Sequence, residues 1–158
     1  MIKKIISSGQ PGASRAALDW ALTHGIDYGG WCPRGRKVHD GKLDSRYELI
    51  EETQESGNDQ STRWNVRDGD GTVVFTLEPK LRRHAKKVFR IAEESGKPCL
   101  HIAGVDEENG SEALRKFIEE NDIAVLMIAG SHESMELGIY FFTEDTLNET
   151  FGCDSQAI

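Results

Sequence analysis

The sequence is poor in cysteine and in long apolar runs, and each shortage excludes a class of protein. Only three cysteines occur among 158 residues, Cys32, Cys99 and Cys153, with neither zinc-ligand spacing nor a CxxC pair. This sparse, odd count argues against a disulfide framework and fits a reducing compartment. No apolar run approaches the ~20 residues that a membrane-spanning helix needs, and the first residues are predicted to be a strand rather than a signal peptide. We therefore expect a cytoplasmic protein with no membrane partner.

Positive charge is outnumbered by negative charge, which argues against a nucleic-acid partner. Nineteen Lys and Arg stand against 27 Asp and Glu, a formal net charge of −8, whereas nonspecific duplex binding depends on cations that neutralise phosphates. The imbalance is uneven, because residues 1–37 hold six cations and two acids, and the remainder holds thirteen and twenty-five. A basic beginning on an acidic body favours a local site for a small anion.

Apolar strands and amphipathic helices alternate along the chain, which is typical of an α/β fold with a mostly parallel sheet between two layers of helices. Strands are predicted at Ile2–Ser8, Thr72–Leu77, Pro98–Ala103 and Ile123–Ala129, with a weaker one at Ile26–Cys32. Helices are predicted at Ala13–His24, Thr62–Asp68, between Pro79 and Gly96, at Ser111–Asn121 and at Gly138–Phe151. Pro33–Tyr47 is predicted to be a loop, and Leu49–Ser61 shows no periodicity. The length fits one domain, residues 1–151, followed by a tail at 152–158.

The first strand-to-helix turn indicates an anion site. Its residues Gly9 to Gly12 lead directly into the helix that begins at Ala13. Such a helix start leaves backbone N–H groups unpaired beside the positive end of the helix dipole. The predicted donors to an oxyanion are Gly9, Gln10, Gly12, Ala13 and Ser14. The turn matches neither a P-loop nor a GxGxxG fingerprint, so a tight turn that binds nothing is the alternative.

Further residues of the predicted site come from other turns. Ligands of parallel α/β sheets lie outside the carboxyl ends of the strands, where strand order reverses. This rule gathers Gly9–Arg15, Trp31–Lys37, Glu78–Leu81, Gly104–Val105 and Gly130–Ser134. From these stretches we add Arg15, Arg34, Arg36, Lys80, Gly130 and Ser131 to the predicted site. Arginine suits bidentate recognition of an oxyanion, but an Arg15–Asp19 ion pair and a solvated loop around Gly35 are the alternatives.

Other candidates have a structural interpretation beside the functional one. Cys32 suits a soft metal as its thiolate or is a buried, inert thiol. Trp31 suits stacking on a pterin or base, or packs in the core. His132 and Glu133 suit acid–base chemistry, whereas Glu133 beside Ser131 or Ser134 equally suits a helix start. The other four histidines show no ligand spacing.

Collinear motifs over nearly the whole chain carry a resemblance to a known family. They are Ser8–Asp19, Gly29–Arg36, Asp40–Gly41, Arg46–Tyr47, Arg63–Thr72, Gly96–Pro98, Gly130–Ser134 and Gly138–Tyr140. Together they resemble the molybdenum carrier family over about residues 3–151. That family is similar in turn to the Rossmann-like group that contains the cytokinin-activating phosphoribohydrolases.

The resemblance implies a Rossmann-like three-layer sandwich, a homo-oligomer (dimer or tetramer), and a site for molybdenum cofactor or a nucleotide-like phosphate ligand. Two departures from the family pattern affect that site. The first turn lacks a second glycine and a threonine, having Ser8, Gly9 and Pro11 instead. After the middle strand, a Gly-Gly-Thr turn is replaced by Glu78–Arg83. Glycines let a backbone approach phosphate closely, so point charges on Lys80, Arg82 or Arg83 would have to replace N–H groups.

These observations favour a non-catalytic protein that binds a phosphate-bearing small molecule, either molybdenum cofactor or a nucleotide. The alternative is a nucleotide-processing enzyme that hydrolyses an N-glycosidic bond, which requires a carboxylate beside the phosphate turn. The related enzymes keep a glutamate just after their glycine-rich turn, whereas here the nearest acid, Glu78, precedes Pro79–Arg83. A nucleotide-sensing subunit without turnover is a third hypothesis.

Overall fold

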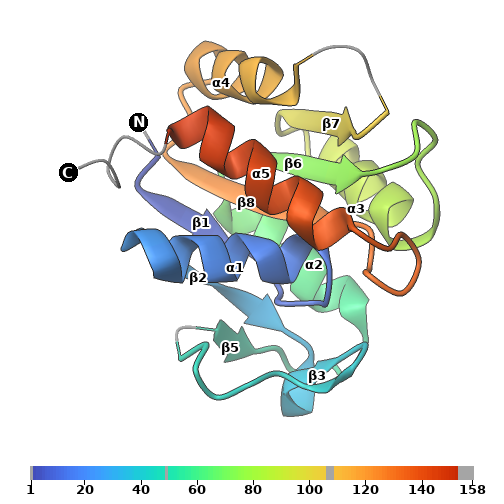
Figure 1. Cartoon of the computed structure of the whole chain (residues 1–158). Coiled ribbons are helices and arrows are strands. Elements are labelled where there is room, and N and C mark those ends of the chain that lie inside the picture. Colours follow the sequence, from blue (N-terminus) through green and yellow to red (C-terminus); the bar gives the residue numbers. More distant parts are fainter. Residues whose placement is uncertain (1, 49, 106–108, 153–158) are drawn as a thin grey trace.

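A parallel sheet of six strands forms the centre of the described chain, residues 2–48, 50–105 and 109–152 of a computed structural model (Figure 1). The strand order is β5-β2-β1-β8-β6-β7, and each of these pairings is parallel. The strands are β1 (Lys4–Ile6), β2 (Asp27–Cys32), β5 (Ile50–Glu52), β6 (Gly71–Thr76), β7 (Cys99–Ala103) and β8 (Val125–Gly130). A separate antiparallel hairpin joins β3 (Lys37–Val38) to β4 (Gly41–Lys42) and follows a short 3-10 turn at Arg34–Arg36.

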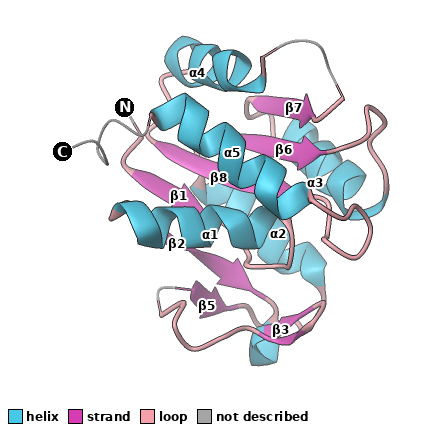
Figure 2. Cartoon of the chain, viewed as in Figure 1, coloured by secondary structure: helices cyan, strands magenta, loops and turns pink. Residues whose placement is uncertain are grey.

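Helices cover both faces of this sheet, as Figure 2 shows. On one face lie α1 (Ala13–His24), α4 (Gly110–Glu120) and α5 (Ile139–Phe151), and α5 packs between the other two. On the opposite face lie α2 (Asn58–Asp68) and α3 (Arg83–Glu94). The Rossmann-like α/β three-layer fold with a parallel sheet is therefore confirmed.

The helix α1 approaches the sheet closely because its buried face consists mainly of alanines. Ala13, Ala17 and Ala21 are fully buried. At the end of β8, a Cβ added to Gly130 would come 2.7 Å from the Cβ of Ala13 and 2.2 Å from the carbonyl oxygen of Phe75. Gly130 is thus required by packing at the place where β8 passes between α1 and β6.

Apolar side chains fill the space on both faces of the sheet. The larger cluster, under α1, α4 and α5, includes Phe75, Leu126 and Leu147, each fully buried. The cluster under α2 and α3 includes Val74 and Val88. Because side chains of β6 alternate between the two clusters, this strand is buried on both faces, as its continuous apolar sequence predicts. Burying each such side chain stabilises the fold by roughly 1.5–3 kcal/mol.

Three local predictions were wrong. The aperiodic stretch contains β5, which pairs with β2 at the sheet edge, and α2 begins at Asn58 rather than Thr62. The segment predicted as a loop after Pro33 contains the β3–β4 hairpin. Two- and three-residue strands are too short to show periodicity, so the pairing partner defines them.

Some expectations lie beyond what the structure tests. Apart from Gly152, the expected tail at 152–158 lies outside the described residues, and the division into one domain and a tail stays a prediction. In the described ranges, no helix combines the length and apolar character needed to cross a bilayer.

Candidate functional site

The first turn is closed by the protein's own backbone. The amide of Ala13 donates to the carbonyl of Ser131 (3.3 Å), and the amide of Glu133 donates to the carbonyl of Pro11 (3.1 Å). Gly12, with φ 111°, lies so close to this segment that an added Cβ would sit 2.4 Å from the Ser131 oxygen. Gly12 therefore permits a backbone contact between two turns, and that contact takes up one of the N–H groups expected to hold an anion.

The polar side chains of this turn also have partners in the protein. Gln10 is buried, where its Oε1 accepts from the amide of His39 (2.8 Å) and its Nε2 donates to Asn58 Oδ1 (3.2 Å). The hydroxyl of Ser14 is buried with no hydrogen-bond partner among the residues that the structure describes. Because of its two hydrogen bonds, Gln10 positions the β3–β4 hairpin and the start of α2.

Arg15 links the first turn to the β3–β4 hairpin through hydrogen bonds. Its Nε donates to the carbonyl of Gly9 (3.0 Å), and its two terminal nitrogens grip both carboxylate oxygens of Asp40 (2.8 and 3.0 Å). This bidentate hydrogen bond lowers the pKa of Asp40. The alternative that the sequence offered, an ion pair with Asp19, is not formed, because Asp19 pairs with Arg46 instead.

Arg36 and Arg34 do not contact the first turn, and the two side chains have different neighbours. The guanidinium of Arg36 donates hydrogen bonds to carbonyl oxygens of a single loop. The acceptors are the carbonyls of Leu43, Asp44, Tyr47 and Ile50, at 2.8–3.3 Å. Arg34 borders a shallow hollow with Gln54 and Glu55, beyond β2. The three predicted arginines thus do not converge on one point.

A cavity of about 620 Å³ lies instead over the carboxyl ends of β6 and β8, within the range typical of small-molecule sites. Its walls are the segment 78–85 after β6, the segment 131–136 after β8, and His39 of the hairpin. β1 continues through α1 to β2 on one side, and β6 continues through α3 to β7 on the other, so strand order reverses here. Of the predicted site residues, Lys80 and Ser131 line this cavity, and Gly130 immediately precedes it.

Positive charge gathers on one wall of the cavity. Lys80, Arg82 and Arg83 line it together with the first turn of α3. A helix start offers N–H donors and the positive end of the dipole. Arg83 has φ 48°, a left-handed conformation that is uncommon for a residue other than glycine. The cations that the sequence offered as substitutes for a glycine-rich turn therefore do surround a cavity.

Glu136 also lines the cavity and links the two strand ends. Its carboxylate accepts from the amide of Leu77 (3.0 Å), the amide of Glu78 (2.9 Å) and the hydroxyl of Ser131 (2.5 Å). Burial alone would raise the pKa of Glu136, but these hydrogen bonds outweigh it and lower the pKa. An internal anion thus occupies the backbone amides just after β6, where a ligand's oxyanion is expected in related folds.

Three histidines line the cavity with their rings in contact, which the sequence did not predict. The ring centroid of His132 lies 4.8 Å from that of His84 and 5.1 Å from that of His39. Burial, together with His132 and Lys87, lowers the pKa of His84 to about 4. Burial and the neighbouring His39 lower the pKa of His132. All three imidazole positions come from different segments, so no spacing rule could have found the cluster.

The remaining candidates have structural roles. Glu133 caps α5, because its carboxylate accepts from the amides of Gly138 (2.6 Å) and Tyr140 (3.0 Å). Cys32 is fully buried, and burial raises the pKa of its thiol, so it stays protonated. Trp31 packs edge-on against Trp64 with centroids 4.8 Å apart. The structural alternatives for Cys32 and Trp31 therefore describe their environment.

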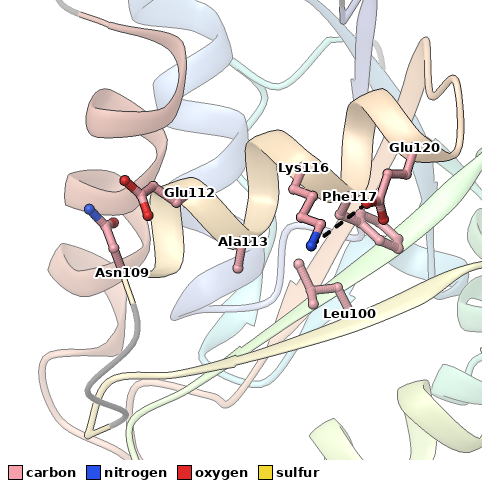
Figure 3. A pocket seen from close by; sticks show the side chains of 7 residues that line it. All are labelled: Leu100, Asn109, Glu112, Ala113, Lys116, Phe117 and Glu120. Carbon is pink, nitrogen blue, oxygen red and sulfur yellow. Dashed lines mark ion pairs between the residues drawn. The ribbon is translucent and has the colours of Figure 1, made fainter.

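Another hollow runs along the edge strand β7 beneath α4, as Figure 3 shows. Leu100 and Phe117 supply its apolar floor, while the charged Lys116 and Glu120 pair with each other at 3.8 Å. Neither side chain of this exposed pair needs a ligand. None of the predicted site residues lies here, so the cavity over β6 and β8 is the better candidate site.

Comparison with known proteins places this chain in a family. No curated protein matches the chain. The crystal structure of a "putative molybdenum carrier protein" from Syntrophus aciditrophicus SB is similar to it, with 37% sequence identity, a TM-score of 0.89 and coverage of 96% of each chain. The circularly permutated YpsA SLOG family matches residues 5–151. The resemblance to molybdenum carriers is thus confirmed, and the chain belongs to the circularly permutated YpsA SLOG family.

Proposed function

We propose that this protein binds a phosphate-bearing small molecule, such as molybdenum cofactor or a nucleotide, in the cavity over β6 and β8. The observation that carries the proposal is the convergence of Lys80, Arg82 and Arg83 with the start of α3 on one cavity. Cations and helix-start amides favour a phosphate dianion. The name of the Syntrophus relative supports a carrier role.

The other walls suit the remainder of such a ligand. His39 and His132 offer aromatic faces, and Met135, half exposed, offers a flexible apolar contact. The volume of about 620 Å³ leaves room for a ring system beside the phosphate group. The chain therefore supplies both a charged end and a stacking end, which is the arrangement that pterin phosphates and nucleotides require.

Hydrolysis of a nucleotide is the less favoured function. It requires a carboxylate that is free to act on the sugar or on water. Glu136 lines the cavity, but its two oxygens already accept three hydrogen bonds, two of them from the backbone. Incubating the protein with a panel of nucleoside monophosphates tests this function directly, because release of free base would reverse the order of the two proposals.

Ligand binding is tested by thermal shift with adenosine monophosphate and inorganic phosphate. Saturation at a hundredfold excess over Kd should stabilise the protein by ~2.7 kcal/mol. Lys80→Ala and Arg82→Ala should remove most of the shift. Lys116→Ala is the matched control, because it removes the same charge from the hollow in Figure 3. Equal shifts in all variants would show that the cavity is not the site.

The carrier role has its own measurement. Protein purified from a molybdate-replete host should contain molybdenum and absorb above the range of its aromatic residues if it carries the cofactor. The Lys80→Ala variant, expressed in parallel, should contain less. Molybdenum absent from the wild type, together with a thermal shift by nucleotides, would favour a nucleotide as the ligand.

We further propose a cytoplasmic homo-oligomer. Leu137 and Phe141 are 80% and 65% exposed and lie close in sequence at the start of α5, beside Met135 at 50%. Large apolar side chains gathered at the surface favour a protein contact. Light scattering of the wild type should give a mass that is a multiple of 17.6 kDa, and Leu137→Asp with Phe141→Asp should shift it to the monomer.

A further inference from the structure

A site that only attracts phosphate does not explain why three histidines, His39, His84 and His132, line the cavity. We call these three residues the histidine cluster. The ring of His132 lies tilted against those of His84 and His39, with centroids 4.8 and 5.1 Å away. All three imidazoles border the cavity that the cations of the segment after β6 also line. The Nε2 atom of His132 is buried and has no hydrogen-bond partner among the residues that the structure describes. A buried, unpartnered ring nitrogen is costly unless a ligand or a proton uses it.

We propose that the cavity binds its anion together with a proton, which the histidine cluster takes up. The inference rests on the proposed function, because it requires an anion in this cavity. Burial and neighbouring positive charge lower the pKa values of His84 and His132, so these two rings favour the neutral form before an anion binds. A dianion held in the cavity, beside both the rings and the cations, reverses that balance because it attracts a proton to the nearest ring.

The groups around the cluster support this direction. The neighbouring acids are already engaged: Asp40 pairs with Arg15, Glu133 caps α5, and Glu136 accepts three hydrogen bonds. Lys87 of α3, which contributes to the low pKa of His84, pairs with Asp59 of α2. The remaining charged groups that line the cavity are Glu78, Lys80, Arg82 and Arg83. Cations thus outnumber acids around the rings, which favours neutral imidazoles until an anion arrives.

Proton uptake makes a quantitative prediction about affinity. Between the pKa values of the free and the occupied cluster, the affinity for a dianion should rise by up to about tenfold for each unit by which pH falls. A site that held the anion with lysine and arginine side chains alone would show no such dependence, because ordinary lysines and arginines keep their charge near neutral pH.

Calorimetric titration with sulfate tests the proposal, because sulfate itself does not titrate between about pH 5 and about pH 8, where free imidazoles do. Repeating the titration in buffers of different ionisation enthalpy gives the number of protons taken up. We expect up to one proton for each sulfate in the wild type, and much less in His132→Gln, with weaker pH dependence. His24→Gln is the matched control, because His24 stacks on Trp20 at the far end of α1.

A second measurement remains valid if His132→Gln fails to fold. Imidazole resonances of the wild type, followed by NMR against pH, should shift to higher pKa values for His84 or His132 when sulfate is added. Sulfate and adenosine monophosphate that both fail to bind at any pH would overturn the proposed function as well. Sulfate binding without proton uptake, or undiminished uptake by a folded His132→Gln variant, would overturn this inference alone.

Discussion

Two helix starts lie at the same edge of the sheet, and they differ in what faces them. The start of α1 contacts the segment after β8, which supplies an acceptor to the amide of Ala13 and leaves no room for a Cβ at Gly12. The start of α3 borders an open cavity with Lys80 and Arg82 beside it. Both have unpaired amides by construction, but the protein itself occupies part of the first.

The difference shows that a glycine-bounded turn is not by itself an anion site. Glycine permits a close approach, and the approaching group can equally be a backbone as a phosphate. Around Gly12 the approaching group is the carbonyl of Ser131. At the end of β6 the carboxylate of Glu136 accepts from the amides of Leu77 and Glu78, whereas the start of α3 borders the open cavity. Each prediction below tests one side of this comparison.

The largest effect is expected at the closed turn. Gly12→Ala should destabilise the fold by about 4 kcal/mol or more, because the new Cβ would lie 2.4 Å from a backbone oxygen and 2.7 Å from a backbone nitrogen. Gly41→Ala is the matched control: it has a similar φ of 127° with no atom within 4 Å of the added Cβ, and should cost only about 1–3 kcal/mol. Urea unfolding measures both. Equal losses would mean that the turn is not closed as described.

The second largest effect is expected from acid, which should lower the free energy of unfolding through His84, a residue that lines the cavity. Unfolded His84 binds a proton with a pKa near 6.5, whereas the folded pKa is about 4. The unfolded state therefore takes up the proton first, so this contribution is complete above about pH 6.5 and is lost as pH falls towards 4. Its size is about 3 kcal/mol.

Chemical unfolding at a series of pH values checks this contribution. A His84→Gln variant should lose the part of the acid sensitivity between about pH 6.5 and about pH 4, whatever its stability at neutral pH. His24→Gln, which changes a histidine outside the cavity, should retain it. An unchanged pH profile in a folded His84→Gln variant would contradict the burial of this ring.

Glu136→Gln should lower stability by a smaller amount and raise the affinity for phosphate. Replacing the carboxylate weakens three hydrogen bonds and should cost about 1–2 kcal/mol. It also removes a negative charge from the cavity, so affinity for phosphate should increase. Glu133→Gln is the control, since that carboxylate also accepts from two amides but does not line the cavity. Only the Glu136 variant should bind phosphate more tightly, as judged by calorimetry.

The smallest changes in stability are expected when a cation is removed from either turn, and the effect on phosphate binding then distinguishes the two turns. Arg15→Ala breaks a partly exposed ion pair with Asp40 and should cost about 0.5–1 kcal/mol while leaving phosphate binding intact. Lys80→Ala, at an exposed position, should change stability by less than about 0.5 kcal/mol and still weaken binding. Paired denaturation and thermal-shift measurements decide between them. A loss of phosphate binding in Arg15→Ala would return the site to the first turn.

Prediction from sequence was most successful where a pattern is local. The predicted helix at Ala13–His24 has the bounds observed, because its alanine periodicity and Gly25 both act within the helix. The buried strand β6 followed equally from its continuous apolar residues. The edge strand β5 could not be predicted, since three residues acquire their structure by pairing with β2. Lys80 and Ser131 were placed near the cavity by the topology rule rather than by any motif.

The sequence by itself determined the alternation of strands and helices, and hence a parallel sheet with strand-to-helix turns along one edge, because periodicity and turn residues act over a few neighbouring positions. Only the tertiary structure decided which turn is open. Whether an amide is free depends on an acceptor that arrives from a remote segment, as Ser131 does at Ala13. The cluster of His39, His84 and His132 likewise exists only because the strand order brings residues more than forty positions apart to one cavity.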